Sequence, residues 1–274
     1  MTNLAATPLR ITGTTRVMFI MGDPIRHVVG TAVLNAAWGR LGRDLVTVPL
    51  HVTPERLADT LGMLRATPNV AGTGITIPHK IEALGLMDHL TEAARNVGAV
   101  NFVRRNTDGS LTGHNVDGAG FVAGLAEAGH DVRGRTVVLA GAGGVARAIA
   151  FAVAGAGAAR LVIVNRSMDR AEALAQAVGD WPGAAGCTVV AGGPIEAADL
   201  YINGTSLGMR DGDPLPFDLA CLVPGAVVAE VVMTPAVTPL LAAAADRGCR
   251  VVPGRAMLDP QADLVAAFLD GQPA

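Results

Sequence analysis

Charged residues and cysteines are scarce in this chain. Only 16% of the 274 residues are charged, and the formal net charge is −3. That balance gives no electrostatic reason to expect nucleic acid or an anionic membrane as a partner. The three cysteines, Cys187, Cys221 and Cys249, are far apart and form no CxxC pair. This spacing predicts buried, reduced thiols in a cytoplasmic protein rather than a disulfide framework.

Targeting and membrane signals are also lacking. The N-terminal segment does not have the basic-then-apolar layout of a signal peptide. The longest apolar stretch, 148–159, is rich in Ala and Gly, too short to span a bilayer, and followed by Arg160. No His, Cys or Asp cluster has metal-ligand spacing, so no metal site is expected.

Apolar, strand-like runs alternate with helical patterns almost throughout. This alternation predicts an α/β fold with largely parallel sheets. Turn residues gather in the segment "TGHNVDGAG", which places a domain boundary near Asp117, and Asp259-Pro260 marks the start of a last helix ending near Phe268. Strands are expected in two series, at 17–21, 45–50, 70–77 and 99–103, and then at 136–140, 161–165, 188–191, 200–203 and 227–232.

The segment "TVVLAGAGGVARAIAFAVAG" is the most informative. Its strand-like start meets a G-x-G-x-x-A pattern that opens a helix. The first glycine permits a tight turn, the second lets the backbone approach a pyrophosphate, and the small third residue allows close helix–strand packing. The segment therefore predicts a dinucleotide-binding turn, with cofactor contacts at Gly141, Ala142, Gly143, Gly144, Val145 and Ala146.

The end of the following strand indicates which dinucleotide is bound. An NAD site places Asp or Glu there to accept hydrogen bonds from the ribose hydroxyls. This chain has Asn165, Arg166 and Ser167, with Arg170 one turn later. Because arginine pairs with a 2′-phosphate that a carboxylate would repel, NADP is favoured over NAD.

Candidate catalytic groups follow several strands of the first series. Lys80 comes after an expected strand end, Asn101 ends another, and Asn115 and Asp117 lie in a Gly-rich loop. Parallel sheets gather ligands at the carboxyl ends of their strands, so these side chains are expected to converge. A lysine whose pKa is lowered by burial can take a proton from an alcohol during hydride transfer, and a carboxylate can orient it.

A series of motifs extends over nearly the whole chain. In order, they are Gly22-x-Pro24-Ile25-x-His27, Thr76-x-Pro78-x-Lys80, Gly98-Ala99-Val100-Asn101, Asn115-x-Asp117-Gly118, Gly141-Ala142-Gly143-Gly144, Asn165-Arg166-Ser167, Asn203-x-Thr205-Ser206-x-Gly208-Met209, Thr238-Pro239-Leu240-Leu241, and Gly254 to Gln261-Ala262. Together they resemble the shikimate dehydrogenase family of NADP-dependent enzymes, which interconvert 3-dehydroshikimate and shikimate. The resemblance implies a substrate-binding domain, 1–116, completed by the C-terminal helix, 255–274. It implies a Rossmann-type NADP domain, 117–254, with the active site in the cleft between the domains.

The resemblance also implies roles for individual residues. Lys80 and Asp117 match the family's catalytic pair, and Thr76, Asn101 and Gln261 match residues that contact the substrate. Further cofactor contacts are implied at Arg166, Arg170, Thr205, Ser206 and Gly254.

Several family residues are replaced on one side of the substrate site. The family has His-Ser-x-Ser-Pro in its opening loop, and the two serines bond the substrate carboxylate; Val28 and Gly30 stand there in this chain. Gly74 replaces an Asn, Val116 a Thr, and Met233 a Tyr. Loss of two charge-assisted hydrogen bonds, at roughly 1.5–3 kcal/mol each, predicts shikimate binding weaker by about two to four orders of magnitude.

Three functions therefore remain open at the level of sequence. The first is a shikimate dehydrogenase, and the second is a relative that acts on quinate, an aminated analogue or a cyclic polyol without the carboxylate. The third is a nonenzymatic NADP-binding sensor, against which the presence of Lys80 and Asp117 argues. The expected partner is a small hydroxy acid or polyol, and the oligomeric state is left open.

Overall fold

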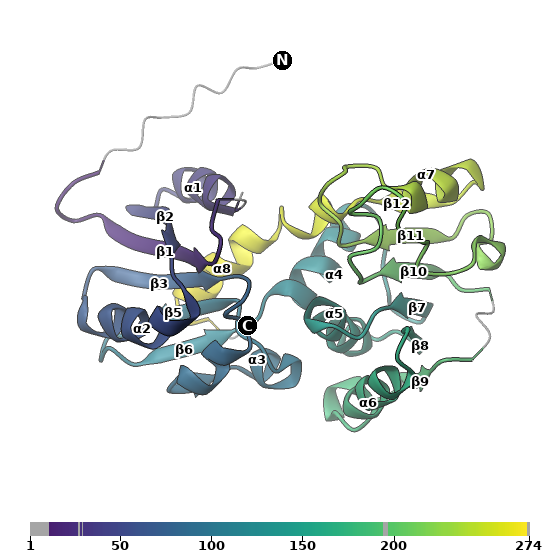
Figure 1. Ribbon diagram of the computed structural model, residues 1–274, viewed down its shortest axis with the longest axis horizontal. Helices are drawn as coiled ribbons and strands as arrows, with labels where there is room; N and C mark the ends of the chain where they lie inside the picture. The colour runs from purple at the N-terminus through teal and green to yellow at the C-terminus, as the bar shows by residue number, and fades with distance from the viewer. Residues whose placement is uncertain (1–10, 27, 29, 194–196, 273–274) are drawn as a thin grey trace, which may run out of the picture. The chain divides into compact units, whose positions relative to one another are not determined.

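The computed structural model describes residues 11–26, 28, 30–193 and 197–272, and it divides into two compact units (Figure 1). Of the described residues, unit 1 comprises those from 11 to 116 and from 262 to 272, and unit 2 comprises those from 117 to 261. The first boundary falls at Asp117, as the turn residues predict. His27 and Val29 of the opening loop lie outside the described residues.

The second boundary falls after Gln261 rather than at Gly254. The turn Gly254–Met257 packs against helix α4 (Asp117–Glu127) of unit 2. A Cβ atom at Gly124 of α4 would lie 2.2 Å from the Ala256 carbonyl oxygen, so the two backbones are in direct contact. Residues 254–261 therefore belong to unit 2, and the C-terminal segment joins unit 1 only from Ala262.

Unit 1 contains a six-stranded mixed sheet in the order β2-β1-β3-β5-β6-β4. β1, β2 and β3 run parallel, whereas β5 is antiparallel to both β3 and β6. The sheet is thus less parallel than predicted, because β5 runs antiparallel to both of its neighbours; β4 and β6 were not recognised in the sequence. The strands are β1 (Arg16–Gly22), β2 (Leu45–His51), β3 (Val70–Ile75), β4 (His89–Leu90), β5 (Phe102–Arg105) and β6 (Leu111–His114).

Two predicted strand ends in unit 1 are wrong. β3 ends at Ile75 rather than at Ile77, and β5 begins at Phe102, so Asn101 precedes a strand instead of ending one. The backbone before β5 is bonded elsewhere, since Val100 N–H donates to the Lys80 carbonyl at 2.8 Å and Asn101 N–H to the His114 carbonyl at 3.0 Å. These bonds draw the polar segments together at one edge of the sheet.

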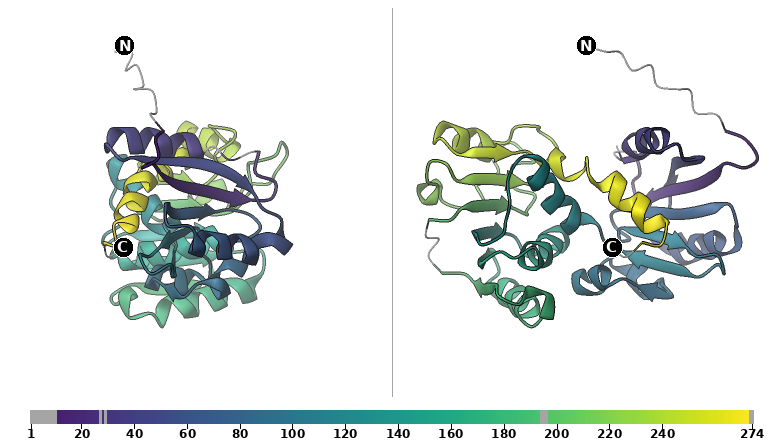
Figure 2. Two further views of the ribbon diagram at one scale, coloured as in Figure 1. Left: turned by 90° about the vertical axis from the view of Figure 1, so that its left-hand side faces the viewer. Right: turned by 180° about the vertical axis from the view of Figure 1, so that it is seen from behind.

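Helices cover both faces of this sheet (Figure 2). On one face, Leu34 and Trp38 of the first helix and Val265 of the last belong to the same buried cluster. On the other face, the cluster includes Leu57, Leu61 and Leu64 of the second helix. The helices are α1 (Gly30–Arg40), α2 (Leu57–Ala66), α3 (Glu92–Val97) and α8 (Gln261–Leu269).

Unit 2 contains a six-stranded parallel sheet in the order β12-β11-β10-β7-β8-β9. This is a Rossmann-type arrangement, in which the strand order reverses between β7 and β10 and ligands bind at the carboxyl ends beside that point. Only β12 was not predicted. The strands are β7 (Thr136–Ala140), β8 (Arg160–Val164), β9 (Thr188–Ala191), β10 (Leu200–Asn203), β11 (Val227–Glu230) and β12 (Arg250–Val252).

Alternate residues of each strand in unit 2 face opposite helical layers. Val137 and Leu139 pack in the cluster that contains residues of α4, α5 (Gly144–Gly155) and α6 (Met168–Gly179). Val138 and Ala140 pack in the cluster that contains residues of α7 (Pro239–Asp246). Both faces of the sheet are therefore covered by helices. A ligand can reach the sheet only at the ends of its strands.

Cys187, Cys221 and Cys249 are free thiols, as expected, but they are half-buried rather than buried. In the described part of the chain, no helix has both the length and the apolar character needed to cross a membrane. Among the same residues, no group of three or more His, Cys, Asp or Glu side chains is arranged to hold a metal ion.

Candidate functional site

The turn between β7 and α5 has the geometry that its glycines predict. Gly141 has φ +115°, and a Cβ atom there would lie 3.0 Å from the Gly204 carbonyl oxygen. Gly143 and Gly144 are exposed, and a Cβ atom at either would meet no other atom within 4 Å. The start of α5 is therefore open to an approaching anion, and its first N–H groups are available to bind one.

Small residues also bring α5 close to the sheet. Ala146 is fully buried, and a Cβ atom at Gly204 would lie 2.9 Å from the Ala146 Cβ. A larger side chain at either position would push the helix away from the ends of β7 and β10. This close approach confirms the packing that the third position of the motif predicts.

The end of β8 presents the predicted polar group. Asn165 Nδ2 donates to the Ser167 carbonyl at 2.9 Å and fixes the turn into α6. Arg166 and Arg170 are exposed, which leaves both guanidinium groups accessible to a phosphate. Asp169 lies in the first turn of α6, where a carboxylate interacts favourably with the helix dipole.

A pocket of about 530 Å³ joins these elements within unit 2. It brings the first glycine of the turn together with the polar ends of β8 and β10. Pro214, Leu215 and Pro216 close it on one side. The predicted cofactor residues that line it are Gly141, Asn165, Arg166, Thr205 and Ser206.

The other predicted cofactor residues lie around this pocket without lining it. Ala142, Gly143, Gly144 and Val145 follow Gly141 along the turn, and Ala146 is buried beneath them. Gly254 is buried at a different place, and a Cβ atom there would lie 2.2 Å from the Val232 carbonyl oxygen. This close packing of the backbone explains why position 254 requires a residue without a side chain.

A buried polar network beneath the pocket was not recognised from sequence. Asn203, at the end of β10, accepts hydrogen bonds from the Thr205 hydroxyl at 2.6 Å and the Thr205 N–H at 3.1 Å. Its Nδ2 donates to the Leu207 carbonyl at 2.9 Å. This fully buried side chain therefore shapes the turn whose residues line the pocket.

Glu230 continues the network at the end of β11, in register with Asn203. It is 1% exposed, and Thr238, the N-cap of α7, donates to Glu230 Oε2 at 2.9 Å. Burial raises the pKa of Glu230 to about 6, and the hydrogen bonds from Thr238 and Asn203 oppose that shift. The one available signal in the sequence was an acidic residue at the end of an otherwise apolar strand.

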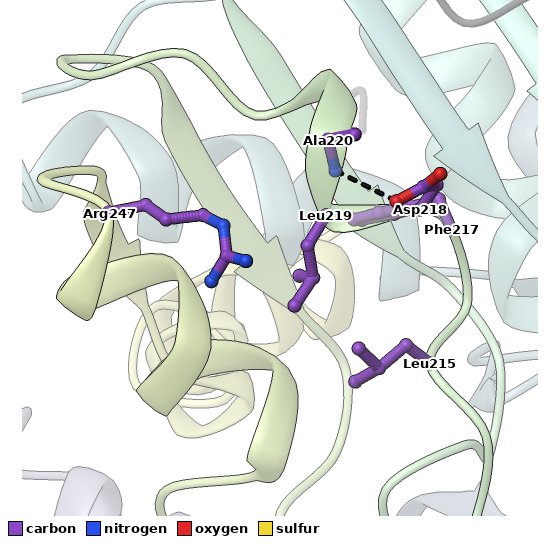
Figure 3. Close-up of a pocket in the computed structure, with 6 residues that line it drawn as sticks. All are labelled: Leu215, Phe217, Asp218, Leu219, Ala220 and Arg247. Carbon is purple, nitrogen blue, oxygen red and sulfur yellow. Dashed lines mark hydrogen bonds between the residues drawn. The ribbon is translucent and has the colours of Figure 1, made fainter.

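A second hollow in unit 2, of about 650 Å³, carries none of the predicted residues. Figure 3 shows the Asp218 carboxylate turned to the Ala220 N–H, which donates to it at 2.8 Å. Arg247 extends toward the hollow from the end of α7. Because no further polar side chains converge there, its volume alone does not mark a ligand site.

In unit 1, Lys80 follows β3 in a segment held by several hydrogen bonds. Its neighbour His79 is fully buried, and a hydrogen bond of 2.7 Å joins His79 Nε2 to the Val52 carbonyl. Lys80 itself is half-buried, and its carbonyl accepts from Val100 N–H. The buried histidine thus anchors the segment that carries the half-buried lysine.

Asn101 is the centre of the polar edge of unit 1. It is 4% exposed, its Oδ1 accepts from Val116 N–H at 3.0 Å, and its carbonyl accepts from Ile75 N–H at 2.7 Å. Asn115 Nδ2 donates to the Ala99 carbonyl at 3.1 Å. The structure therefore brings Asn101 beside the end of β3 and holds the segment that leads directly into Asp117.

The remaining predicted substrate residues differ in exposure. Thr76 is half-buried directly after β3, and Val28 and Gly30 are half-buried before and at the start of α1. Gln261 is 9% exposed, and its Nε2 has no hydrogen-bond partner among the described residues. Met233 is 36% exposed after β11.

The pocket in unit 2 fits the chemistry of NADP. An accessible helix start suits a pyrophosphate, and the cations at the end of β8 suit a 2′-phosphate. Arg166 lines the pocket itself. The residues present thus match the charge of the predicted cofactor.

Comparison with known proteins agrees with this geometry. Residues 20–103 match the family model described as "Shikimate dehydrogenase substrate binding domain", and residues 124–205 match "Shikimate / quinate 5-dehydrogenase". The chain is 43% identical to the shikimate dehydrogenase (NADP(+)) of Rubrobacter xylanophilus over 256 residues, which cover 91% of this chain and 88% of that protein.

Solved structures give the same result. Shikimate 5-dehydrogenase from Listeria monocytogenes, in complex with shikimate and NAD, matches with a TM-score of 0.87 and 31% identity, over 96% of this chain and 94% of that chain. The ligand-free 5-ketofructose reductase of Gluconobacter sp. strain CHM43 matches with a TM-score of 0.84 and 32% identity, over 94% of each chain. The chain therefore belongs to the shikimate dehydrogenase family.

Proposed function

We propose that the protein is an NADP-dependent oxidoreductase that interconverts the ring hydroxyl of shikimate, or of a close analogue, with the corresponding ketone. In this proposal Lys80 and Asp117 form the catalytic pair. The 43% identity to an NADP-dependent shikimate dehydrogenase and the polar pocket of unit 2 both support it.

The single observation that carries the proposed chemistry is that Lys80 is the only lysine in the chain. The other 20 of the 21 basic Lys and Arg residues are arginines. Arginine provides positive charge and hydrogen bonds, but its guanidinium does not lose a proton in proteins. A lysine amine can release and accept a proton, so among the Lys and Arg residues only Lys80 can act as a general base.

In the oxidative direction, the substrate C–H bond breaks with transfer of a hydride, and the hydroxyl O–H bond breaks with transfer of its proton to the Lys80 amine. A C=O bond forms, so the alcohol becomes a ketone. NADP, when bound, supplies the nicotinamide ring that accepts the hydride. Asp117 is proposed to orient the lysine amine by hydrogen bonding.

Other residues bind the reactants. Thr76, Asn101 and Gln261 are proposed to hydrogen-bond the substrate hydroxyls. The start of α5 is proposed to bind the pyrophosphate, and Arg166 and Arg170 the 2′-phosphate. Thr205 and Ser206, which line the same pocket, are proposed to contact the cofactor as well.

The test is NADP⁺ reduction by the purified protein with shikimate, followed by absorbance, for the wild type and for Lys80→Arg and Lys80→Ala. Both variants should lose about 10²- to 10⁴-fold in kcat, as expected when a general base is removed. NADPH binding, measured by fluorescence, should be unchanged in both. Added methylamine should partly restore Lys80→Ala but leave Lys80→Arg inactive.

Asp117→Asn should lower kcat as well, with the exposed Asp59→Asn substitution on α2 as its matched control. Full turnover by Lys80→Arg would contradict proton transfer at this position. NADPH binding without turnover of any alcohol by the wild type would favour the sensor function instead.

A further inference from the structure

Three neighbouring strands of unit 1 place a glycine between two apolar side chains. Gly74 of β3 pairs with Ile20 of β1 on one side and with Phe102 of β5 on the other. The three residues lie close to the carboxyl end of β3, which ends at Ile75. This is the same edge at which Asn101 and Lys80 are held.

The side chains of Ile20 and Phe102 pack on either side of Gly74. A Cβ atom there would lie 3.2 Å from Ile20 Cγ1 and 3.2 Å from Phe102 Cε1. Neither distance leaves room for a longer polar side chain unless Phe102 moves. The aromatic ring therefore occupies the space that a hydrogen-bonding residue at position 74 would need.

The start of α1 extends this surface. Val28 packs on the buried cluster that contains Ile20 and Val116, and a Cβ atom at Gly30 would lie 3.2 Å from Ile20 Cδ1. The Val28 N–H is already used, since it donates to the Ile25 carbonyl at 3.1 Å. We call Ile20, Val28, Gly30, Gly74 and Phe102 the apolar wall.

The apolar wall has no side-chain hydrogen-bond donor. A carboxylate placed against it would lose its water without gaining charge-assisted bonds, and each such bond is worth roughly 1.5–3 kcal/mol. The remaining donors on this side are the main-chain N–H groups at the start of α1. By contrast, Thr76, Asn101 and Lys80 at the same edge suit hydroxyl and carbonyl groups.

We propose that the apolar wall determines substrate specificity, so that the site accepts polyhydroxy alcohols and ketones without a carboxylate at least as well as shikimate. This inference rests on the proposed function. Among the solved relatives, the Gluconobacter protein named for the uncharged ketose 5-ketofructose is as similar to the chain as the shikimate-bound Listeria enzyme.

The test compares shikimate with its methyl ester, which keeps the ring hydroxyls but has no carboxylate charge. In NADP⁺ reduction by the wild type, kcat/KM for the ester should equal or exceed that for shikimate. The double variant Val28→Ser/Gly30→Ser should raise kcat/KM for shikimate at least about tenfold, the effect of one charge-assisted bond. The value for the ester should stay unchanged. Gly39→Ser is the matched control, because it lies on α1 where a Cβ atom meets no other atom within 4 Å.

Wild-type kcat/KM more than 100-fold higher for shikimate than for its ester would overturn this inference and leave the proposed function intact. Absence of NADP⁺ reduction with both compounds and with 5-ketofructose and NADPH in the reverse direction would overturn the proposed function itself. If the double variant does not fold, calorimetric titration of shikimate into the wild type without NADP⁺, where no turnover is possible, measures the dissociation constant instead. A dissociation constant of about 10 μM or below would contradict the inference, and one above about 1 mM would support it.

Discussion

The carboxyl-end edges of the two sheets are built in different ways. In unit 2 the edge consists of backbone and of polar groups that follow their strands directly, such as Gly141, Asn165 and Thr205. In unit 1 the corresponding edge combines Asn101 with an apolar wall assembled across strands β1, β3 and β5. A site made by backbone tolerates little change, because glycine at a positive φ has few substitutes. A site made by side chains can change its specificity through single substitutions. Substitutions in unit 1 and in unit 2 test this comparison.

The largest expected effect concerns His114, at the end of β6 in unit 1. It is 4% exposed, and a hydrogen bond of 2.8 Å joins its Nδ1 to the Thr91 hydroxyl. Burial, and then the charge of Arg104, lower the pKa of His114 to about 4. The unfolded chain takes up the proton near pH 6.5, so the free energy of unfolding should decrease as the pH falls from 6.5 to 4, by up to about 3 kcal/mol.

Urea unfolding of the wild type and of His114→Gln at several pH values measures this contribution. The variant should be less stable at pH 7.5 and should show a smaller loss of stability on acidification. Equal pH slopes for the two proteins would contradict a neutral, buried His114.

Arg166 tests the polar edge of unit 2. Arg166→Asp should reduce the ratio of kcat/KM for NADP⁺ to that for NAD⁺ by about thirtyfold, or about 2 kcal/mol, because a carboxylate repels the 2′-phosphate and accepts from a ribose hydroxyl. The matched control is Arg160→Asp, at an exposed position at the start of β8, away from the carboxyl-end edge. An unchanged ratio in Arg166→Asp would remove Arg166 from the site.

Glu230 in unit 2 should have the opposite pH dependence to His114. Its pKa is raised to about 6 by burial, so the folded protein holds a proton that the unfolded chain releases. The free energy of unfolding should therefore decrease as the pH rises from about 4.5 to 6, by about 1–2 kcal/mol. Glu230→Gln should remove this decrease, whereas the exposed Glu172→Gln on α6 should retain it. An identical pH profile for wild type and Glu230→Gln would be inconsistent with this environment.

The smallest effect is expected where α8 meets the rest of unit 1. Arg40 of α1 and Asp263 of α8 form an ion pair at 2.6 Å, with both side chains more than half exposed. Exposed ion pairs contribute about 0–1 kcal/mol, so Arg40→Gln should lower the melting temperature only slightly, and less at high salt. Val265→Ala, which creates a cavity at a fully buried position of the same helix, is the reference. If Arg40→Gln lowers the melting temperature as much as Val265→Ala does, the ion pair contributes more to stability than expected.

Sequence patterns predicted the β7–α5 segment of unit 2 well because its residues are consecutive. β7, the glycine turn and the start of α5 form one continuous segment, and their roles follow from local backbone requirements. The boundary at Asp117 is also a local feature of the sequence, because turn residues cluster around it. The short strands β4, β6 and β12 were missed because a few residues carry too little periodicity to be recognised.

The hydrogen-bond network around Glu230 and the position of Asn101 could not be predicted from local sequence patterns. Asn203 and Glu230 pair only because β10 and β11 lie in register. Asn101 was expected at a strand end, but it precedes β5, and its backbone is bonded to Ile75 and His114, the last residues of β3 and β6. Such contacts depend on which strands are neighbours in the sheet, and the order of residues in the chain does not specify this.

The sequence by itself therefore determined the two-unit α/β organisation, the glycine turn between β7 and α5, and the family, because each is encoded in short segments with local backbone requirements. Only the tertiary structure decided that Ile20 and Phe102 pack on either side of Gly74 and that the Glu230 carboxyl group is buried at the end of β11. The physical reason is that packing joins side chains from separate strands, and the space left for one depends on the volume of the others.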